Sequence, residues 1–421
     1  MRDSDDDRRD DDQRFELLTP EFFQDPYPAY ARLRERAPVH FHEPLNAWLL
    51  SRYEDVDLLL RDRRTSADRV GPLLAQAPAE LREDALLLGR FLGDWMPFTD
   101  APGHTRLRGL MTRTFSARTI AGLRGFIERT TDELLDAAAR KGEFDLLKDL
   151  AIPLPLRVIG HVLGIRDRDL DDFKRWSTDL MAVPMMSGDP AARYGRAIAA
   201  VRAVESLCGE LIADRRARPG AYPDLLAHLV AAEVDGQSLT DEELTACCAL
   251  IMVGGHETTS YAITNAVLAL LEHPEQLAAL REDPAGLAGA AVEESLRWNT
   301  LSGWMGRIAT EDLEIGGQPI PAGSLVFGLT GSANRDERAY ENPERFDIRR
   351  RTAGARRHLT FGYGLHMCLG AALARMEAGI CLERLITRMP ELRPATDRVR
   401  WIEGIALRGP VTFPVHCGRE R

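Results

Sequence analysis

Apolar residues recur every three or four positions along most of the chain, the spacing at which one face of an α-helix is buried. This pattern predicts helices at 26–35, 55–61, 81–91, 105–115, 118–140, 154–163, 168–182, 190–216 and 223–232. The longest run begins at Thr240 and continues to about Leu271. It opens with the letters TDEE, a capping box in which a hydroxyl and a carboxylate satisfy free backbone amides. The chain is therefore predicted to be mainly α, around one unusually long central helix.

Other stretches depart from the helical spacing. Residues 47–50 predict a strand, and 301–330, where apolar residues alternate with Gly and Pro, predict short strands and turns. Residues 399–415 predict a terminal hairpin. Residues 65–100 lack a steady period and are interpreted as a mobile loop region around one short helix, and 331–360 are predicted to be irregular. Without an internal repeat or a clear linker, residues 13–421 are predicted to form a single domain, with a large helical lobe and a smaller β-rich lobe.

Composition and charge narrow the classes of function. The 421 residues carry a net charge of −11, which argues against nucleic acid as a partner. Residues 2–12 hold seven Asp and three Arg, and residues 1–12 are predicted to be a disordered acidic tail. The N-terminus resembles no signal peptide and no run of eighteen apolar residues occurs, so no membrane anchor is expected. Six cysteines without a paired framework suit a reducing cytoplasm.

The most informative residue is Cys368, within the stretch 361–370 that reads FGYGLHMCLG before a helix-prone run. A thiol at a helix N-terminus is expected to have a lowered pKa. Gly364 and Gly370 allow a tight turn and the close approach of a flat ligand. No second Cys lies nearby, so a CxxC site is excluded, and a single thiolate suits one axial bond to haem iron. The alternative is a buried, unreactive Cys in a Gly-rich turn.

This stretch resembles the haem-binding loop of the cytochrome P450 family, F-x-x-G-x-[HR]-x-C-x-G, with every fixed position filled. The resemblance extends over nearly all of the chain after the first dozen residues. It implies the mainly α cytochrome P450 fold, with haem b between the long central helix and the Cys loop. It also implies that Cys368 is the axial ligand of the iron and that Phe361, Gly362 and Gly370 lie against the haem.

The middle of the long helix carries the letters GGHETT at 254–259. Two glycines inside a helix cost about 1 kcal/mol each relative to Ala, so a bent or closely approached backbone is expected. The segment resembles the oxygen-binding motif of the family, [AG]-G-x-[DE]-T-[TS]. The resemblance implies that Gly254 and Gly255 open a groove for O2, that Thr258 donates a hydrogen bond to it, and that Glu257 supplies protons. The alternative is a glycine packing site with Thr258 bonded back along its own helix.

A second set of residues resembles the structural signature of the family. Glu294 and Arg297 form an E-x-x-R pair, which shares one helix face and by itself often marks a surface ion pair of little energy. The resemblance implies a buried network of Glu294, Arg297 and Arg345 that supports the haem loop.

The two haem propionates need cations or donors on the protein. His104 and Arg108 lie four apart and share a helix face. With Arg307 and His358 they occupy positions that resemble the propionate ligands of the family. His366 is left unassigned, because it could serve only to shape the turn.

The family's substrate-recognition segments correspond to 70–98, 168–186, 247–255, 301–306 and 404–408. The apolar candidates there are Val70, Leu87, Leu88, Trp95, Met96, Met181, Met185, Met186, Val253, Trp304, Met305, Ile405 and Leu407. A Met-rich, adaptable lining predicts a small lipophilic substrate, such as a terpenoid, polyketide, steroid or fatty acyl compound. The alternative is that half of these side chains belong to the core.

The resemblance implies a soluble bacterial haem-thiolate monooxygenase that inserts one atom of O2 into this substrate by hydroxylation or epoxidation. The chain ends about fifty residues after Cys368 without a flavin domain or a cysteine set for an iron–sulfur cluster. Electrons from NAD(P)H are therefore expected through a separate ferredoxin or flavodoxin with its reductase.

The docking site for that redox partner is predicted at a basic cluster before the haem loop. Its members are Arg349, Arg350, Arg351, Arg356 and Arg357. Such a cluster on an acidic protein could steer an acidic partner. The alternative is a solvated Arg-rich loop.

Two other functions stay open on the sequence. The same scaffold could perform oxidative coupling, desaturation or peroxide-driven chemistry, or it could be a non-catalytic haem sensor or carrier. Glu257 and Thr258 argue against a dependence on peroxide, because protons can be delivered to O2, and a sensor or carrier has little need for this pair. A monomer is the default expectation.

Overall fold

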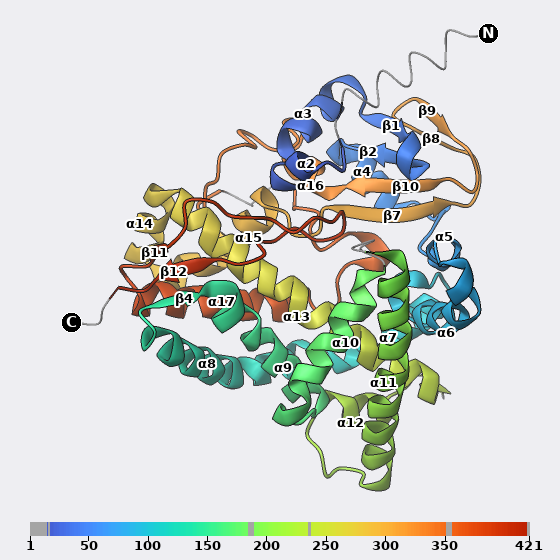
Figure 1. The fold of residues 1–421 in the computed structure, drawn as a ribbon, viewed down its shortest axis with the longest axis horizontal. Helices are drawn as coiled ribbons and strands as arrows, with labels where there is room; N and C mark the ends of the chain where they lie inside the picture. Colours follow the sequence, from blue (N-terminus) through green and yellow to red (C-terminus); the bar gives the residue numbers. More distant parts are fainter. Residues whose placement is uncertain (1–14, 16, 184–188, 235–236, 351–355, 419–421) are drawn as a thin grey trace.

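The chain folds into a large helical lobe and a smaller lobe built around a sheet (Figure 1). This computed structural model describes residues 15, 17–183, 189–234, 237–350 and 356–418. The longer helices are α6 (Arg82–Gly93), α7 (Gly103–Thr114), α8 (Ala117–Ala139), α9 (Pro153–Leu163), α10 (Leu170–Ala182), α11 (Pro190–Ala217), α13 (Asp241–Glu272), α14 (Pro274–Glu282), α15 (Pro284–Trp298) and α17 (Ala371–Arg388). The predicted helices are all present, with ends within two residues of the predicted ones.

Helix α13 runs through the middle of the helical lobe (Figure 1). The predicted capping box is confirmed, because the Thr240 hydroxyl accepts from the Glu243 amide at 3.2 Å and the Glu243 carboxylate accepts from the Thr240 amide at 3.0 Å. Most of its residues between Leu244 and Leu270 are buried, and α9, α11, α15 and α17 pack around it. A helix that is buried on all sides is held in place by its neighbours. The position of residues 254–258 is therefore set by packing.

The smaller lobe holds a five-stranded sheet in the order β1-β2-β10-β7-β3. Its strands are β1 (Val39–His42), β2 (Ala47–Leu50), β10 (Leu325–Leu329), β7 (Trp304–Ala309) and β3 (Thr65–Ser66). Strands β2 and β10 are parallel and the other pairs are antiparallel. In β7, successive side chains point to opposite faces of the sheet. Met305 and Arg307 therefore share one face, and Trp304 points to the other.

The chain's tail follows the predicted hairpin only in part. Trp401 and Pro410 form an antiparallel bridge, and the Ile402 amide donates to the Gly409 carbonyl at 3.0 Å. Beyond this turn the tail joins another sheet, because β12 (Pro414–His416) lies between β4 (Glu143–Asp145) and β11 (Arg393–Pro394). Two further strand pairs are β5 (Glu233–Val234) with β6 (Gln237–Ser238), and β8 (Leu313–Ile315) with β9 (Gln318–Ile320).

The prediction of a largely irregular segment at 65–100 is wrong. Besides β3 and α6, it contains α5 (Val70–Ala75) and the short helices η2 (Ala79–Leu81) and η3 (Met96–Phe98). Helix α5 has only six residues, too few for a helical period to stand out in the sequence. Gly89 lets α6 approach it, since a Cβ there would meet Leu74 at 2.5 Å.

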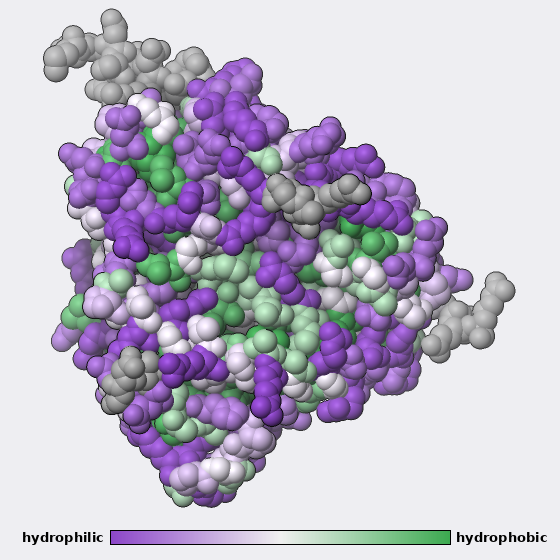
Figure 2. All heavy atoms as spheres, turned by 180° about the vertical axis from the view of Figure 1, so that it is seen from behind, coloured by the Kyte–Doolittle hydropathy of each residue, from purple (hydrophilic) through white to green (hydrophobic). Residues whose placement is uncertain are grey.

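Shorter helices complete the fold. They are α2 (Pro20–Gln24), α3 (Tyr27–Arg36), α4 (Tyr53–Arg61), α12 (Leu225–Val230), α16 (Thr330–Ala333), η1 (Glu43–Leu45), η4 (Leu146–Ala151), η5 (Asp167–Asp169) and η6 (Gly364–His366). Within the described ranges, none of the helices combines the length and the apolar character needed to cross a bilayer. Figure 2 shows one face covered largely by hydrophilic residues, with apolar residues gathered near its middle.

Candidate active site

The loop that carries Cys368 lies between η6 and α17. It is closed by the Cys368 amide, which donates to the Phe361 carbonyl at 2.8 Å. Gly362 and Gly364 have φ angles of +71° and +68°, which favour glycine. Gly370 lies in the predicted turn, but its φ of −81° is one that any residue can adopt. A Cβ on Gly370 would instead lie 4.0 Å from the Cys368 sulfur, so this glycine keeps one side of the sulfur uncovered.

The electrostatic surroundings of Cys368 differ from the prediction. Its side chain is exposed, yet desolvation by the surrounding protein raises the pKa of the thiol. Backbone amides of Gly370 and Ala371 and the charges of Arg108 and Arg375 act in the opposite direction and are outweighed. The helix N-terminus therefore favours the thiolate, as predicted, but the net pKa is raised. Coordination to a metal deprotonates such a thiol outright.

A cluster of basic side chains lies beside the loop. His104 from α7 is buried, and its ring centroid is 4.2 Å from that of His366. Neither of its nitrogens has a hydrogen-bond partner among the residues that the structure describes. Desolvation and the nearby Arg307 lower the pKa of His366 to about 3. Desolvation also lowers the pKa of Arg307, on β7, to about 10. Buried cationic groups are costly unless an anion compensates them. The cluster, completed by Arg108, therefore fits an anionic ligand, as a haem carboxylate is.

His358, the fourth predicted propionate ligand, belongs to a different group of side chains. Its Nε2 hydrogen-bonds to Glu293 on α15 at 3.2 Å, and Arg375 on α17 donates to the same carboxylate at 2.6 and 3.1 Å. The Arg375 guanidinium also lies 4.4 Å from the centre of the Phe361 ring. Only His358 Nδ1 is without a partner. The group of His358, Glu293 and Arg375, called the Glu293 group below, supports the Cys loop through the contact of Arg375 with Phe361.

The Glu293 group predicts how the stability of the protein responds to acid. Desolvation would raise the pKa of Glu293, but hydrogen bonds from His358 and Arg375 outweigh it and lower the pKa from 4.5 to about 2. The unfolded chain then binds more protons than the folded one in this window, so Glu293 stabilises the fold above pH 4.5 and less as pH falls toward 2. Urea midpoints measured between pH 6 and pH 3 should fall less steeply for Glu293→Gln than for wild type. The exposed Glu314→Gln is the control, and an unchanged slope for Glu293→Gln would contradict the assignment.

The two glycines of α13 have different surroundings. A Cβ on Gly254 would meet no atom within 4 Å, whereas one on Gly255 would lie 2.4 Å from Ile159 on α9. Gly254 therefore leaves open space. Gly255 does not share in a groove, as the resemblance implied, because this glycine allows α13 to pack closely against α9. The Thr258 hydroxyl donates to the Gly254 carbonyl at 2.8 Å, the back-bonded geometry of the alternative interpretation. Glu257 accepts from the Thr178 hydroxyl on α10 at 2.8 Å, a partner that no sequence signal indicated.

The E-x-x-R pair is buried and fully bonded. Arg297 donates twice to Glu294 at 2.8 Å and to three backbone carbonyls, including that of Arg345 at 3.0 Å. The prediction that the Arg345 side chain is the third member of this network is corrected. That side chain is exposed and forms no ion pair with Glu294. Arg350 takes its place, with Nε 3.1 Å from both carboxylate oxygens of Glu294. Its side chain is 17% exposed.

This finding also changes the predicted docking cluster. Arg350 belongs to the buried network and is not available at the surface. Arg356 pairs with Glu54 at 2.9 Å, and Arg357 lies 3.5 Å from the centre of the Tyr363 ring. Arg351 lies outside the described residues.

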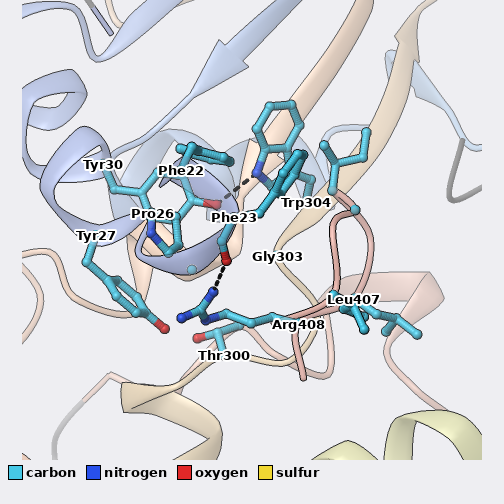
Figure 3. A pocket seen from close by; sticks show the side chains of 14 residues that line it. Phe22, Phe23, Pro26, Tyr27, Tyr30, Thr300, Gly303, Trp304, Leu407 and Arg408 are labelled. Carbon is cyan, nitrogen blue, oxygen red and sulfur yellow. Dashed lines mark hydrogen bonds between the residues drawn. The ribbon is translucent and has the colours of Figure 1, made fainter. Parts of the chain in front are cut away.

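Two predicted substrate-lining residues point away from the Cys loop. The Trp304 indole donates to the Tyr30 hydroxyl at 2.9 Å and packs near Phe22 (Figure 3). Ile405 packs against the same cluster. The cavity that they line has about 30 Å³, room for roughly one water molecule. The prediction that Trp304 and Ile405 line the substrate pocket is therefore wrong.

The remaining positions are spread over three surroundings. The main hydrophobic core contains Leu88, Trp95, Met96, Val253 and Leu407, with Met181 packed against it. Val70 and Leu87 line an open groove of about 800 Å³ between α5, α6 and α11. Met305 reaches the Cys loop, since its sulfur lies 3.6 Å from the Cβ position of Gly362. Met185 and Met186 lie outside the described residues.

A thiol on a glycine-rich loop, a cluster of buried basic groups beside it, and a long helix with an uncovered glycine together define a haem-thiolate protein. Comparison with known proteins agrees. A sequence model described as cytochrome P450 matches residues 76–397. The chain is 43% identical over 407 residues to cytochrome P450 107B1 of Saccharopolyspora erythraea, covering 94% of this chain and 96% of that protein. It is 38% identical over 415 residues to cytochrome P450 monooxygenase PikC of Streptomyces venezuelae, covering 96% and 94%.

Solved structures give the same result. The structure of P450BioI in complex with hexadec-9Z-enoic acid ligated acyl carrier protein matches with a TM-score of 0.86 and 33% identity, covering 94% of this chain and 99% of that chain. Myxobacterial CYP267B1 in complex with myristic acid matches with a TM-score of 0.85 and 36% identity, covering 96% and 99%. The chain belongs to the cytochrome P450 family. It is a monooxygenase that uses haem b with an axial cysteine thiolate, O2, and electrons from NAD(P)H.

Proposed function

We propose that this monooxygenase hydroxylates or epoxidises a medium-sized to large lipophilic molecule, with an acyl or polyketide chain as the favoured class. The Cys368 thiol, beside the buried basic side chains of His104 and Arg307, carries the haem-dependent part of the proposal. The substrate class is supported by the relatives, which include a 6-deoxyerythronolide B hydroxylase and the two structures with fatty acyl ligands.

The residues of this chain divide the chemistry between them. Haem b, when bound, supplies the iron at which O2 is reduced, so that one oxygen atom enters the substrate and the other leaves as water. Cys368 would bind the metal, and His104, Arg108 and Arg307 would hold the carboxylates. Gly254 leaves open space beside α13. Thr258 would turn its hydroxyl from the Gly254 carbonyl toward O2 and donate a proton that Glu257 replaces from solvent.

The redox partner and the setting of the enzyme are part of the proposal. Electrons would come from a separate ferredoxin or flavodoxin with its reductase, docked over the exposed Arg356 without a contribution from Arg350. The free state of all six cysteines supports a reducing cytoplasm, and the protein would act as a monomer.

A substrate search tests the proposal. The holoenzyme is incubated with a surrogate ferredoxin, reductase, NADPH and lipid and polyketide extracts of its host, and products are sought by mass spectrometry. A compound that gains the mass of one oxygen atom, labelled by ¹⁸O2, is the expected result. Label only in water or peroxide, with no organic product from any lipophilic extract, would contradict the proposed substrate class.

The proton path makes its own prediction. Thr258→Ala should lower product formation roughly a hundredfold while NADPH consumption continues and hydrogen peroxide appears, because positioned proton donors contribute factors of this size. Thr259→Ala is the matched control, since Thr259 also bonds back along α13, to the Gly255 carbonyl at 3.2 Å, but is buried. Product per NADPH is measured for both. If Thr258→Ala still formed as much product per NADPH as wild type, Thr258 would not be part of the proton path.

A further inference from the structure

Arg69 is a basic residue that no sequence motif marks. It lies in the segment between β3 and α5. Its guanidinium carbon is 4.9 Å from the centre of the Phe98 ring, and one nitrogen donates to the Pro97 carbonyl at 3.4 Å. On the other side, Arg69 Cδ lies 2.9 Å from the Cβ position of Gly306. Arg69 therefore packs against β7, directly beside Arg307.

Among the described residues, no carboxylate forms an ion pair with Arg69, which donates to the Ala67 and Pro97 carbonyls. Desolvation lowers the pKa of Arg69 to about 9, and repulsion by Arg307 acts in the same direction. Asp100 attracts both arginines, but it accepts its hydrogen bonds from the Ala67 amide at 2.8 Å and from the Ser66 hydroxyl. Asp68 also attracts Arg69, and its carboxylate accepts from the Val70 amide at 3.1 Å. Two guanidinium groups that are partly removed from water repel each other, so an anionic ligand is needed to hold them together.

Arg69 lies near the same part of the Cys loop as Arg307. The charges of both arginines lower the pKa of His366 in that loop, so the two guanidinium groups lie close to the place where the haem carboxylates are expected.

We propose that Arg69 is a third arginine ligand of the haem carboxylates and fastens the segment before α5 to the edge of the haem. This role adds Arg69 to His104, Arg108 and Arg307, the ligands that the sequence motifs indicate. It does not depend on the proposed substrate or on the proton path. Because Val70 and α5 follow directly, haem binding and the position of the groove between α5, α6 and α11 are coupled.

The test compares Arg69→Gln with Arg64→Gln. Arg64 is a nearby arginine whose side chain is 46% exposed and pairs with Asp62 at 2.7 Å, so it serves as the control. Haem transfer from each holoprotein to excess apomyoglobin is followed by absorbance. A charge-assisted hydrogen bond predicts transfer about ten- to a hundredfold faster for Arg69→Gln and an unchanged rate for Arg64→Gln. Arg69→Lys, which keeps the charge and loses the planar fork, should be intermediate.

A spectroscopic measurement separates a ligand from a merely structural residue. The carboxylate bending bands of the haem in the resonance Raman spectrum report hydrogen bonds to the carboxylates. They should shift in Arg69→Gln and stay in place in Arg64→Gln. Unchanged bands would overturn the proposal, even if haem were lost faster. If Arg69→Gln yields no holoprotein, the bands of Arg69→Lys decide by the same criterion.

Discussion

Cys368→His is expected to give a protein that still binds haem but no longer oxygenates its substrate. The basic cluster around His104 and Arg307 is untouched, so the carboxylates of the haem keep their partners. A neutral imidazole replaces the anionic sulfur, and with it the electron donation that favours cleavage of the O–O bond is lost. Product formation with the surrogate redox partner should fall below detection at equal haem content.

The control for this variant is another cysteine. Cys417 is buried on the terminal segment, with its thiol 3.1 Å from the Gly142 carbonyl. Cys417→Ala should keep the turnover and the spectrum of the wild type. Oxygenation by Cys368→His at a rate close to that of wild type would show that the sulfur is not the ligand on which the chemistry depends.

The second large effect is expected in the buried network below the loop. Arg297→Ala should lower the free energy of unfolding of the holoprotein by about 3–5 kcal/mol, because it leaves the buried Glu294 carboxylate with one cation fewer and the carbonyls of Asn334 and Pro343 without a donor. Arg297 and Glu294 are 3% and 4% exposed, so solvent cannot replace the lost partner. Urea titrations followed by circular dichroism and by haem absorbance measure the change.

Two neighbouring arginines make this test specific. Arg350 bonds to the Glu294 carboxylate, whereas Arg345 offers only its backbone carbonyl. Arg350→Ala should therefore destabilise the protein clearly, and Arg345→Ala by less than about 0.5 kcal/mol, as exposed residues do. If Arg345→Ala were the more destabilising of the two variants, the network predicted from the sequence would be correct and the one described above would be wrong. A loss below about 1 kcal/mol for Arg297→Ala would mean that the network is not needed for stability.

Features with a local signal could be predicted from the sequence. The capping box at Thr240 and the long apolar run after it are contiguous in the chain, and α13 has the expected start and end. The Cys loop could be predicted equally well, since its glycines, aromatic residue and thiol lie within ten positions of the sequence. The sequence alone therefore led to the mainly α fold, to haem and to Cys368.

Features that depend on contacts between distant segments could not be predicted. Trp304 follows the predicted strand pattern, but only the pairing of β7 with β10 and the position of Tyr30 show which face it takes. Arg350 reaches Glu294 across 56 positions, and no motif distinguishes it from Arg345. Arg69 meets Arg307 only because β3 pairs with β7. In each case packing across the fold, and not local spacing, determines the partner.

The bond between the Cys368 sulfur and haem iron is the claim on which the rest depends. The purified holoprotein is reduced under carbon monoxide and its absorbance spectrum is recorded. The account predicts the strongly red-shifted main band that only a ferrous carbonyl with a thiolate ligand shows, and its loss in Cys368→His. A preparation with full haem content whose band stays where histidine-ligated haem proteins absorb would contradict it.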